Sequence, residues 1–135
     1  VKRLCEKCKV SDKAGADFPP KADSPSEEKN KFEKLLKALP ARVDKKDYEK
    51  IIIYKPKGCD ACGGTGFRGR IAIYELLQVT KDIEMLMNKQ GGEIEIQDFA
   101  VKQGMITMQQ DGILKVISGI TTLEEVEKLT GTIKM

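Results

Sequence analysis

The sequence predicts an α+β fold in which a small β subdomain with an inserted helix precedes a compact bundle of short C-terminal helices. Three observations predict this class. Two cysteine pairs enclose most of the first half of the chain, and β-branched segments lie beside the second pair. From Thr80 onward, apolar residues recur at helical spacing between glycines. We therefore expect two subdomains, residues 1–79 and residues 80–135.

The four cysteines form two CxxC pairs, Cys5 with Cys8 and Cys59 with Cys62, and the chain contains no histidine. Four thiolates in two such pairs are the ligand set of a closed, tetrahedral, structural zinc site. Such a site leaves no position for water or substrate, so the metal would hold the fold together without doing chemistry. Two disulfides are the alternative, but a bridge within CxxC is typical of redox enzymes, whose thioredoxin-like surroundings are missing here.

The composition is that of a small domain with mixed charge. The 135 residues suffice for a modest core, and the formal charge of +3 would fall to +1 with four thiolates and one Zn²⁺. This balance does not favour binding to nucleic acid or to an anionic membrane. No apolar run approaches the ~18 residues of a membrane span. Because the sequence starts at Val1 and reaches the first cysteine pair at once, we expect a piece of a longer cytoplasmic protein.

The first predicted helix follows a polar, proline-containing loop over residues 9–25. Ser24 has the position of an N-cap, Pro25 follows it, and Glu27 completes a capping box. The helix should end at Pro40, and its lysine-rich face over residues 29–37 should be solvated. Its apolar face would carry Phe32, Leu35, Leu36 and Leu39.

Two segments predict strands. Residues 50–55 are β-branched and aromatic, and residues 70–79 follow a glycine-rich turn. We expect these segments to pair, with the two CxxC knuckles at one end of the small sheet. On the second segment, Glu75 is expected to form a structural ion pair with Arg68 or Arg70 instead of acting as a general acid. The residues for a catalytic triad are not found.

Three or four short helices are expected after residue 79. A short strand over residues 93–96 is an alternative for the start of the second helix, because that stretch also alternates. Thr122 and Glu125 form a capping-box pattern for the fourth helix. The helices should begin at Thr80, near Ile94, at Thr107 and at Thr122, and end at Gly91, Gly104, Gly119 and Gly131. The methionines Met85, Met87, Met105 and Met108 are expected in the core.

The glycine-rich loop from Gly64 to Gly69 matches the GxGxxG pattern of dinucleotide-binding proteins. That fingerprint needs a strand before it and a helix after it, whereas here a cysteine knuckle precedes and a strand is expected to follow. The same loop partly matches the phosphate-binding P-loop pattern, but Arg70 stands in place of the lysine and Ile71 in place of the Ser/Thr. We expect the glycines to let the backbone wrap the thiolates. Residues 59–66 also match the CxxCxGxG unit of Hsp40-type chaperone zinc domains. Those domains carry four such units, whereas this chain carries one.

The stretch from Gly58 to Glu75 resembles the C-terminal region of the type II secretion and type IV pilus assembly ATPases, the PilB/GspE family. The matching pattern is Gly-Cys-x-x-Cys-x-x-x-Gly-Phe-x-Gly-Arg-x-x-Ile-Tyr-Glu. The resemblance covers nearly the whole chain except residues 9–50, where the family varies. Further matches are Arg3-Leu4-Cys5-x-x-Cys8, the "GM…DG" residues Gly104-Met105 and Asp111-Gly112, and the "GxTTLEEV" ending at residues 119–126.

This resemblance implies that Cys5, Cys8, Cys59 and Cys62 bind a structural zinc. It implies a parent ATPase that forms a hexameric ring at the cytoplasmic face of the inner membrane, with ATP and Mg²⁺ bound only by an upstream core. The Walker motifs of that core are absent from this sequence. We expect an accessory domain that is not itself an enzyme. Its partners would be its own ATPase core, neighbouring subunits and the inner-membrane platform protein, without nucleic acid or membrane insertion.

Two other classes of function stay open at this point. A free-standing zinc ribbon that binds nucleic acid would need a basic face, which the charge balance disfavours; salt-dependent binding of DNA or RNA would support it. A chaperone-like or thiol-redox module would suppress aggregation or reduce insulin. No nucleotide contact is assigned to Arg68 or Arg70.

Overall fold

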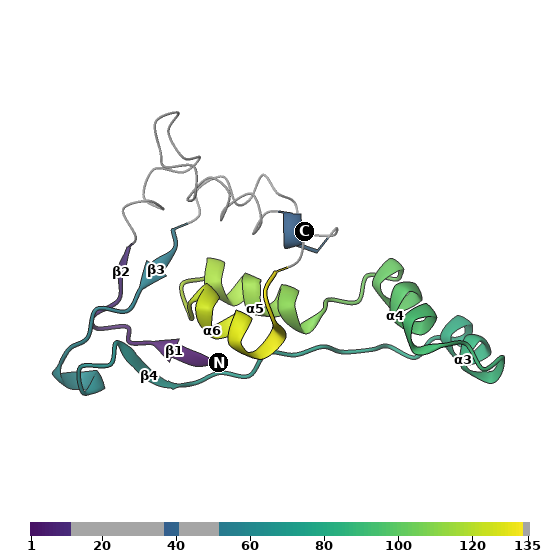
Figure 1. The fold of residues 1–135 in the computed structure, drawn as a ribbon, viewed down its shortest axis with the longest axis horizontal. Helices are drawn as coiled ribbons and strands as arrows, with labels where there is room; N and C mark the ends of the chain where they lie inside the picture. The colour runs from purple at the N-terminus through teal and green to yellow at the C-terminus, as the bar shows by residue number, and fades with distance from the viewer. Residues whose placement is uncertain (12–36, 41–51, 134–135) are drawn as a thin grey trace, which may run out of the picture.

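The computed structural model describes residues 1–11, 37–40 and 52–133. In these residues, short β-strands surround the four cysteines and four helices follow, which confirms the predicted α+β class (Figure 1). The division at residue 79 stays a prediction. None of the helices in the described ranges is both long and apolar enough to cross a lipid bilayer.

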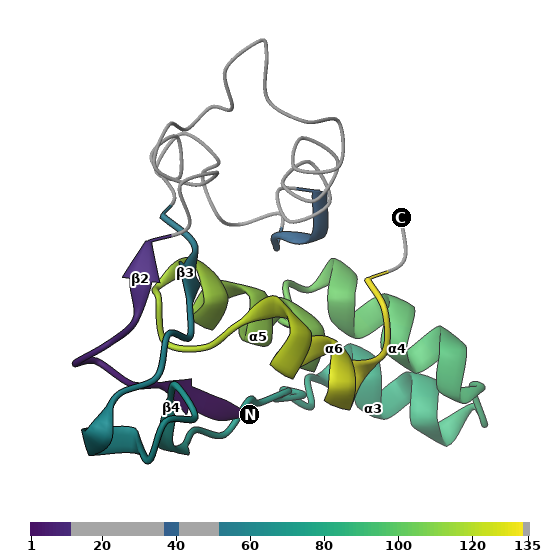
Figure 2. The ribbon, with the colours of Figure 1, turned by 60° about the vertical axis from the view of Figure 1, so that its left-hand side comes forward.

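The strands of the described residues form two separate antiparallel pairs. β1 (Lys2–Leu4) pairs with β4 (Phe67–Arg70), and a bulge separates the Lys2–Arg70 and Leu4–Phe67 partners. β2 (Val10–Ser11) pairs with β3 (Tyr54–Lys55). Figure 2 shows the β2–β3 pair above the β1–β4 pair.

The predicted pairing of residues 50–55 with residues 70–79 is wrong. Each sheet instead joins a strand beside the first cysteine pair to a strand beside the second. The two CxxC turns face each other. The strand before the first turn, β1, therefore pairs with the strand after the second turn, β4, and the strand after the first turn, β2, pairs with the strand before the second, β3. Residues 71–79 are extended but belong to neither sheet, and residues 50–51 lie outside the described part.

Most of the helix predicted between Ser24 and Pro40 lies outside the described residues. Lys37 and Ala38 are helical, and the helix has ended before Pro40, as expected of proline. Leu39 is buried and packs with three residues of the C-terminal helices and tail: Ile113, Leu123 and Ile133. The end of this predicted helix therefore contributes to the core.

Of the three or four helices expected, the described residues contain four: α3 (Lys81–Asn88), α4 (Glu93–Lys102), α5 (Met108–Ile117) and α6 (Leu123–Thr130). Thr80, Thr107 and Thr122 cap α3, α5 and α6, each accepting an N–H from three residues later. Residues 93–96 belong to α4, so the alternative strand is excluded. In α5 the capping box is complete, because the side chain of Gln110 accepts the N–H of Thr107.

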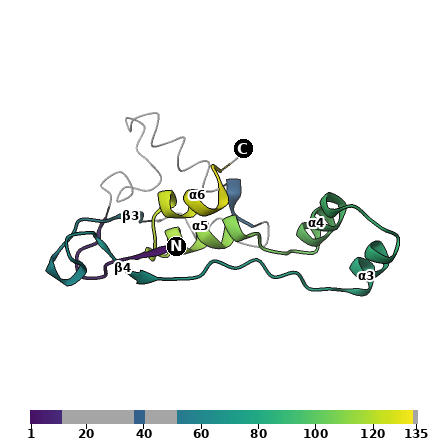
Figure 3. The same ribbon diagram turned by 60° about the horizontal axis from the view of Figure 1, so that its bottom comes forward.

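The helices form two packed pairs, α3 with α4 and α5 with α6. Figures 1 and 3 show the α5–α6 pair beside the strands and the α3–α4 pair at the far end of the molecule. Residues 71–80 and 103–107 connect the two regions. Ile83 and Ala100 are buried in the outer pair, and Ile113, Val116 and Val126 are buried in the inner pair.

The methionines do not fill the core as predicted. Met85, Met87 and Met108 are exposed, at 54%, 42% and 41% of their maximal area, and Met105 is half-buried. The buried apolar side chains of the four helices are instead Ile83, Ala100, Ile113, Val116, Leu123 and Val126. The core prediction for the three exposed methionines is therefore wrong.

Hydrogen bonds attach β1 to the turn between α5 and α6. The N–H of Leu4 donates to the carbonyl of Ile120 at 2.8 Å, and the buried hydroxyl of Thr121 donates to the carbonyl of Lys2 at 2.7 Å. The carboxylate of Glu125 accepts the N–H of Lys2 at 3.3 Å and pairs with Lys128 at 2.7 Å. Glu125 thus connects α6 to β1, where the sequence predicted a capping box with Thr122.

Gly112 allows α5 and α6 to approach closely, and an alanine there should destabilise the protein. A Cβ at Gly112 would lie 2.5 Å from Cγ1 of Val126, which is fully buried and cannot move aside. We expect Gly112→Ala to lower the free energy of unfolding by roughly 1–3 kcal/mol in urea titrations.

The double variant Gly112→Ala/Val126→Ala is the control. Removing the two methyl groups should relieve the clash, so the double variant should be more stable than the sum of the single changes by on the order of 1 kcal/mol. Strict additivity would contradict the proposed contact.

Candidate metal centre

Cys5 and Cys8 lie on a tight turn that follows β1. The N–H groups of Cys8 and Lys9 both donate to the carbonyl of Cys5, at 3.2 and 2.9 Å. This turn directs both thiols to one side of the backbone. Cys5 and Cys8 are 1% and 8% exposed, so the first pair forms the buried half of the cluster.

Cys59 and Cys62 lie on a second turn, built on a single 3₁₀ turn over Asp60–Cys62. The N–H groups of Cys62 and Gly64 donate to the carbonyl of Cys59 at 3.1 and 2.9 Å. The N–H of Cys5 donates to the carbonyl of Gly66 at 2.9 Å and connects the two turns. Each turn therefore presents its two thiols toward the other turn.

The four sulfur atoms lie within 4.8 Å of one another. The Sγ atoms of Cys5 and Cys59 are 3.9 Å apart, those of Cys8 and Cys62 are 3.8 Å apart, and those of Cys59 and Cys62 are 3.8 Å apart. Four sulfurs about 2.3 Å from a tetrahedral metal are about 3.8 Å from one another. All four thiols are free, which argues against the alternative of two disulfides. The donor set fits a metal ion that prefers thiolates.

The surroundings of Cys62 and Cys8 shift the pKa values of these two thiols in opposite directions. Burial raises the pKa of Cys62, but the N–H groups of Cys59 and Gly66, each 3.2 Å from its sulfur, lower that pKa to about 6 overall. Burial, and thiols beside it, raise the pKa of Cys8 to about 12. In the absence of metal, a negative charge in the cluster is therefore held on Cys62 at neutral pH.

Gly66 lets the second turn pack against the residues before it. Its φ of +76° favours glycine, and a Cβ would lie 2.4 Å from Cβ of Pro56. Gly66 also donates to the sulfur of Cys62 and accepts from Cys5. The glycine-rich loop therefore wraps the cysteine cluster, as predicted. It leads into β4 and not into a helix, so it lacks the setting of a dinucleotide fingerprint.

The prediction that Glu75 pairs with Arg68 or Arg70 is wrong within the described residues. Its carboxylate accepts the N–H of Met108 at 2.9 Å, at the N-terminus of α5, where the helix dipole favours negative charge. Arg68 and Arg70 are exposed on β4. Hydrogen bonding at a helix end follows no sequence spacing when the partner is 33 residues away, so this contact could not be predicted from the sequence.

Asp111 and Lys115 make contacts that were not predicted from the sequence. They form an ion pair on α5, and Asp111 also accepts the N–H of Tyr74 at 2.8 Å. The ammonium group of Lys115 lies 5.5 Å from the centre of the Tyr74 ring. The i, i+4 spacing of opposite charges could have identified the ion pair, though not its contact with Tyr74.

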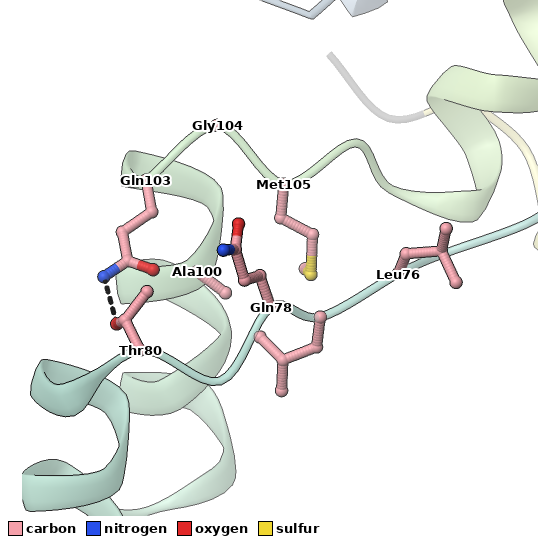
Figure 4. Close-up of a pocket in the computed structure, with 8 residues that line it drawn as sticks. Leu76, Gln78, Thr80, Ala100, Gln103, Gly104 and Met105 are labelled. Carbon is pink, nitrogen blue, oxygen red and sulfur yellow. Dashed lines mark hydrogen bonds between the residues drawn. The ribbon is translucent and has the colours of Figure 1, made fainter.

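A pocket of about 340 Å³ lies between residues 76–80 and the end of α4 (Figure 4). Gln103 donates to the hydroxyl of Thr80 at 2.8 Å across one end of it. Its lining contains no charged side chain, so it offers no general acid or base. The lining residues are Leu76, Leu77, Gln78, Thr80, Ala100, Gln103, Gly104 and Met105.

The family described as "Type II/IV secretion system protein" matches residues 1–128 of this chain. The type IV pilus assembly ATPase PilB of Thermus thermophilus is 37% identical over 126 residues, which are 93% of this chain and 12% of that protein. The PilB of Pseudomonas aeruginosa is 40% identical over 78 residues, 58% of this chain and 14% of that protein.

A secretion protein is similarly related. The type II secretion system ATPase E of Vibrio cholerae is 37% identical over 87 residues, which are 64% of this chain and 17% of that protein. The chain therefore spans between 12% and 17% of the length of these three relatives.

The packing of Gly66 predicts a measurable effect on metal affinity. Gly66→Ala should displace the loop and its N–H bond to Cys62, so affinity for a divalent metal should fall by about 10-fold or more. Co²⁺ titration, followed through its thiolate absorption and competed with a chelator, measures this change.

Gly69→Ala is the matched control. Gly69 has a φ of +78°, so the backbone strain is similar, but a Cβ there meets nothing within 4 Å. Equal losses of affinity in the two variants would show that the contact with Pro56 does not matter to the site.

Proposed function

Because this chain belongs to the type II/IV secretion system protein family, we propose that it is the zinc-binding domain of a secretion or pilus-assembly motor ATPase. The observation that carries the proposal is the coincidence of a family match over residues 1–128 with four cysteine sulfurs within 4.8 Å of one another. The domain is structural in this proposal. It stabilises the region next to the motor core and does not hydrolyse nucleotide.

Zinc is the metal that best suits the site. A tetrahedral set of four thiolates binds zinc in structural sites, and the same set can hold iron. With Cys5, Cys8, Cys59 and Cys62 as ligands, the coordination sphere is filled by protein. A filled sphere offers no position for an activated water, which supports a structural role.

Nucleotide hydrolysis is assigned to polypeptide outside these 135 residues. The relatives are named as ATPases, and the matched stretch is a small part of each. The sequence contains no Walker A loop. The pocket beside α4 has an uncharged lining, so it does not supply the phosphate contacts that such a loop would make.

The same proposal includes the assembly in which the domain works. The motor would be a hexameric ring at the cytoplasmic face of the inner membrane, and this domain would contact its own core, neighbouring subunits or the platform protein. The names of the relatives, which describe ATPases of pilus assembly and of type II secretion, support a role in such a motor. Exposed apolar side chains on α3 and α4, such as Met85 and Ile94, are candidates for these contacts.

Removing one cysteine should remove the metal. Cys59→Ser should reduce bound zinc from one per chain to less than about 0.2, and should lower the unfolding temperature, because zinc binding contributes to folding. Elemental analysis and thermal unfolding measure the two effects. Asp60→Asn, one position away on the same exposed turn, is the control and should keep full zinc content.

The same pair of variants tests the motor. In the complete ATPase, Cys59→Ser should impair pilus assembly or secretion in cells while the Walker motifs are intact, and Asp60→Asn should not. A complete polypeptide without ATPase activity, or a wild-type chain that purifies without zinc, would contradict the proposed function.

Zinc affinity should rise with pH. Zinc binds thiolates, so each proton that zinc displaces adds about tenfold to the affinity per pH unit. Without metal, the pKa of Cys8 is raised to about 12, so this thiol must lose its proton on binding, whereas Cys62, at about 6, is already largely ionised at neutral pH. Chelator competition between about pH 6 and pH 8 should show the rise. An affinity that does not change over this range would contradict ligation of the metal by thiolates.

A further inference from the structure

Residues 72–79 form an extended segment whose sequence favours a β-strand but which has no strand partner in the described part of the chain. This segment connects β4 to the α3–α4 pair (Figure 1). Four of its apolar side chains are exposed: Tyr74 at 59%, Leu76 at 78%, Leu77 at 41% and Val79 at 60%. Such a row of apolar side chains on an unpaired strand is typical of a site where another strand adds.

The two edges of this segment differ. The N–H of Ile71 donates to the carbonyl of Val1, and the amino group of Val1 donates back to the carbonyl of Ile71, both at 2.9 Å. This reciprocal pair continues the β1–β4 ladder by one step. In an antiparallel ladder, every second residue bonds on the same edge, so residues 73, 75, 77 and 79 direct their backbone groups to the same side as Ile71.

The opposite edge faces α5. The N–H of Tyr74, an even-numbered position, donates to the carboxylate of Asp111 at 2.8 Å. Glu75 holds the segment on the N-terminus of α5 through its side chain. Within the described residues, the backbone N–H groups at positions 73, 75, 77 and 79 have no partner, and among the even-numbered positions from 72 to 78 only Tyr74 has one. The odd-numbered edge is distinguished because it continues the Val1–Ile71 pair, so it is the edge along which a chain preceding Val1 would run.

We propose, on the basis of the proposed function, that the residues preceding Val1 in the longer ATPase polypeptide continue β1 as an antiparallel strand along residues 72–79. The relatives named as ATPases are several times longer than the matched stretch, which supplies the polypeptide for this strand. With Val1 opposite Ile71, the eighth residue before Val1 lies opposite Val79. The partner is an apolar strand of the same polypeptide.

This strand would extend the β1–β4 ladder from the cysteine cluster to the start of α3. The cluster fixes one end of β1, and the hydrogen bonds of Glu75 and Asp111 fix the connecting segment on α5. A continuous ladder between them would hold the α3–α4 pair in a defined position relative to the metal site. The metal site would thereby orient helices at the far end of the domain.

Residue-resolved amide exchange tests the pairing. Two ¹⁵N-labelled, zinc-loaded proteins are compared by NMR: the 135-residue chain, and the same chain extended by its natural preceding residues. In the extended protein, the amides of Ile73, Glu75, Leu77 and Val79 should exchange on the order of 100-fold more slowly than in the shorter one. The amides of Leu76 and Gln78, on the other edge, should change far less.

Two proline variants of the extended protein give a matched comparison. Leu77→Pro removes an N–H on the pairing edge and should abolish protection of the neighbouring odd-numbered amides. Leu76→Pro removes an N–H on the other edge and should keep most of it. Both side chains are exposed, so neither change empties the core.

Three results would overturn the proposal. Unprotected odd-numbered amides in the extended protein would exclude the strand. Protection at Leu76 and Gln78 instead would place a partner on the other edge. Protection already present in the 135-residue chain would assign the edge to a second copy, if it depended on concentration, or to another part of the same chain, if it did not. Provided that zinc is bound, none of these three results contradicts the proposed function. The proposed function is contradicted by a different result, namely that the complete polypeptide is not an ATPase.

Discussion

The contact on which the structure depends is the meeting of two short turns whose sulfur-bearing residues are 54 positions apart in the chain. Closing a loop of this length costs roughly 3–4 kcal/mol of chain entropy. Two strand pairs of two to four residues per strand do not offset that cost, because an isolated pair of short strands is only marginally stable in water. A zinc ion held by four thiolates contributes about 10–16 kcal/mol in small domains and offsets it easily.

The path of the rest of the chain follows from this contact. With the two turns facing each other, β1 lies against β4 and β2 against β3. β1 is then bonded to the turn between α5 and α6 through Leu4, Thr121 and Glu125. The cluster therefore positions the inner helix pair as well as the strands, although it lies at one end of the molecule.

Local patterns in the sequence predicted what local physics determines. The CxxC spacing identified all four clustered cysteines, and Thr80, Thr107 and Thr122 were identified as helix caps because a cap depends on neighbours three residues away. Strand partners could not be predicted in this way, since β1 has three residues and its pairing is imposed by the cysteine turns. The contact of Glu75 with α5 and the exposure of Met85 depend on tertiary packing, which leaves no periodic signal.

X-ray absorption at the zinc edge of the purified protein tests the central claim most directly, since it reports the atoms bound to the metal and their distances. A shell of four sulfurs at about 2.3 Å, with no oxygen or nitrogen ligand, is the predicted result. A shell that contains water or a nitrogen ligand, or a protein that holds no zinc at all, would contradict the account of a closed metal site that joins the two halves of the β region.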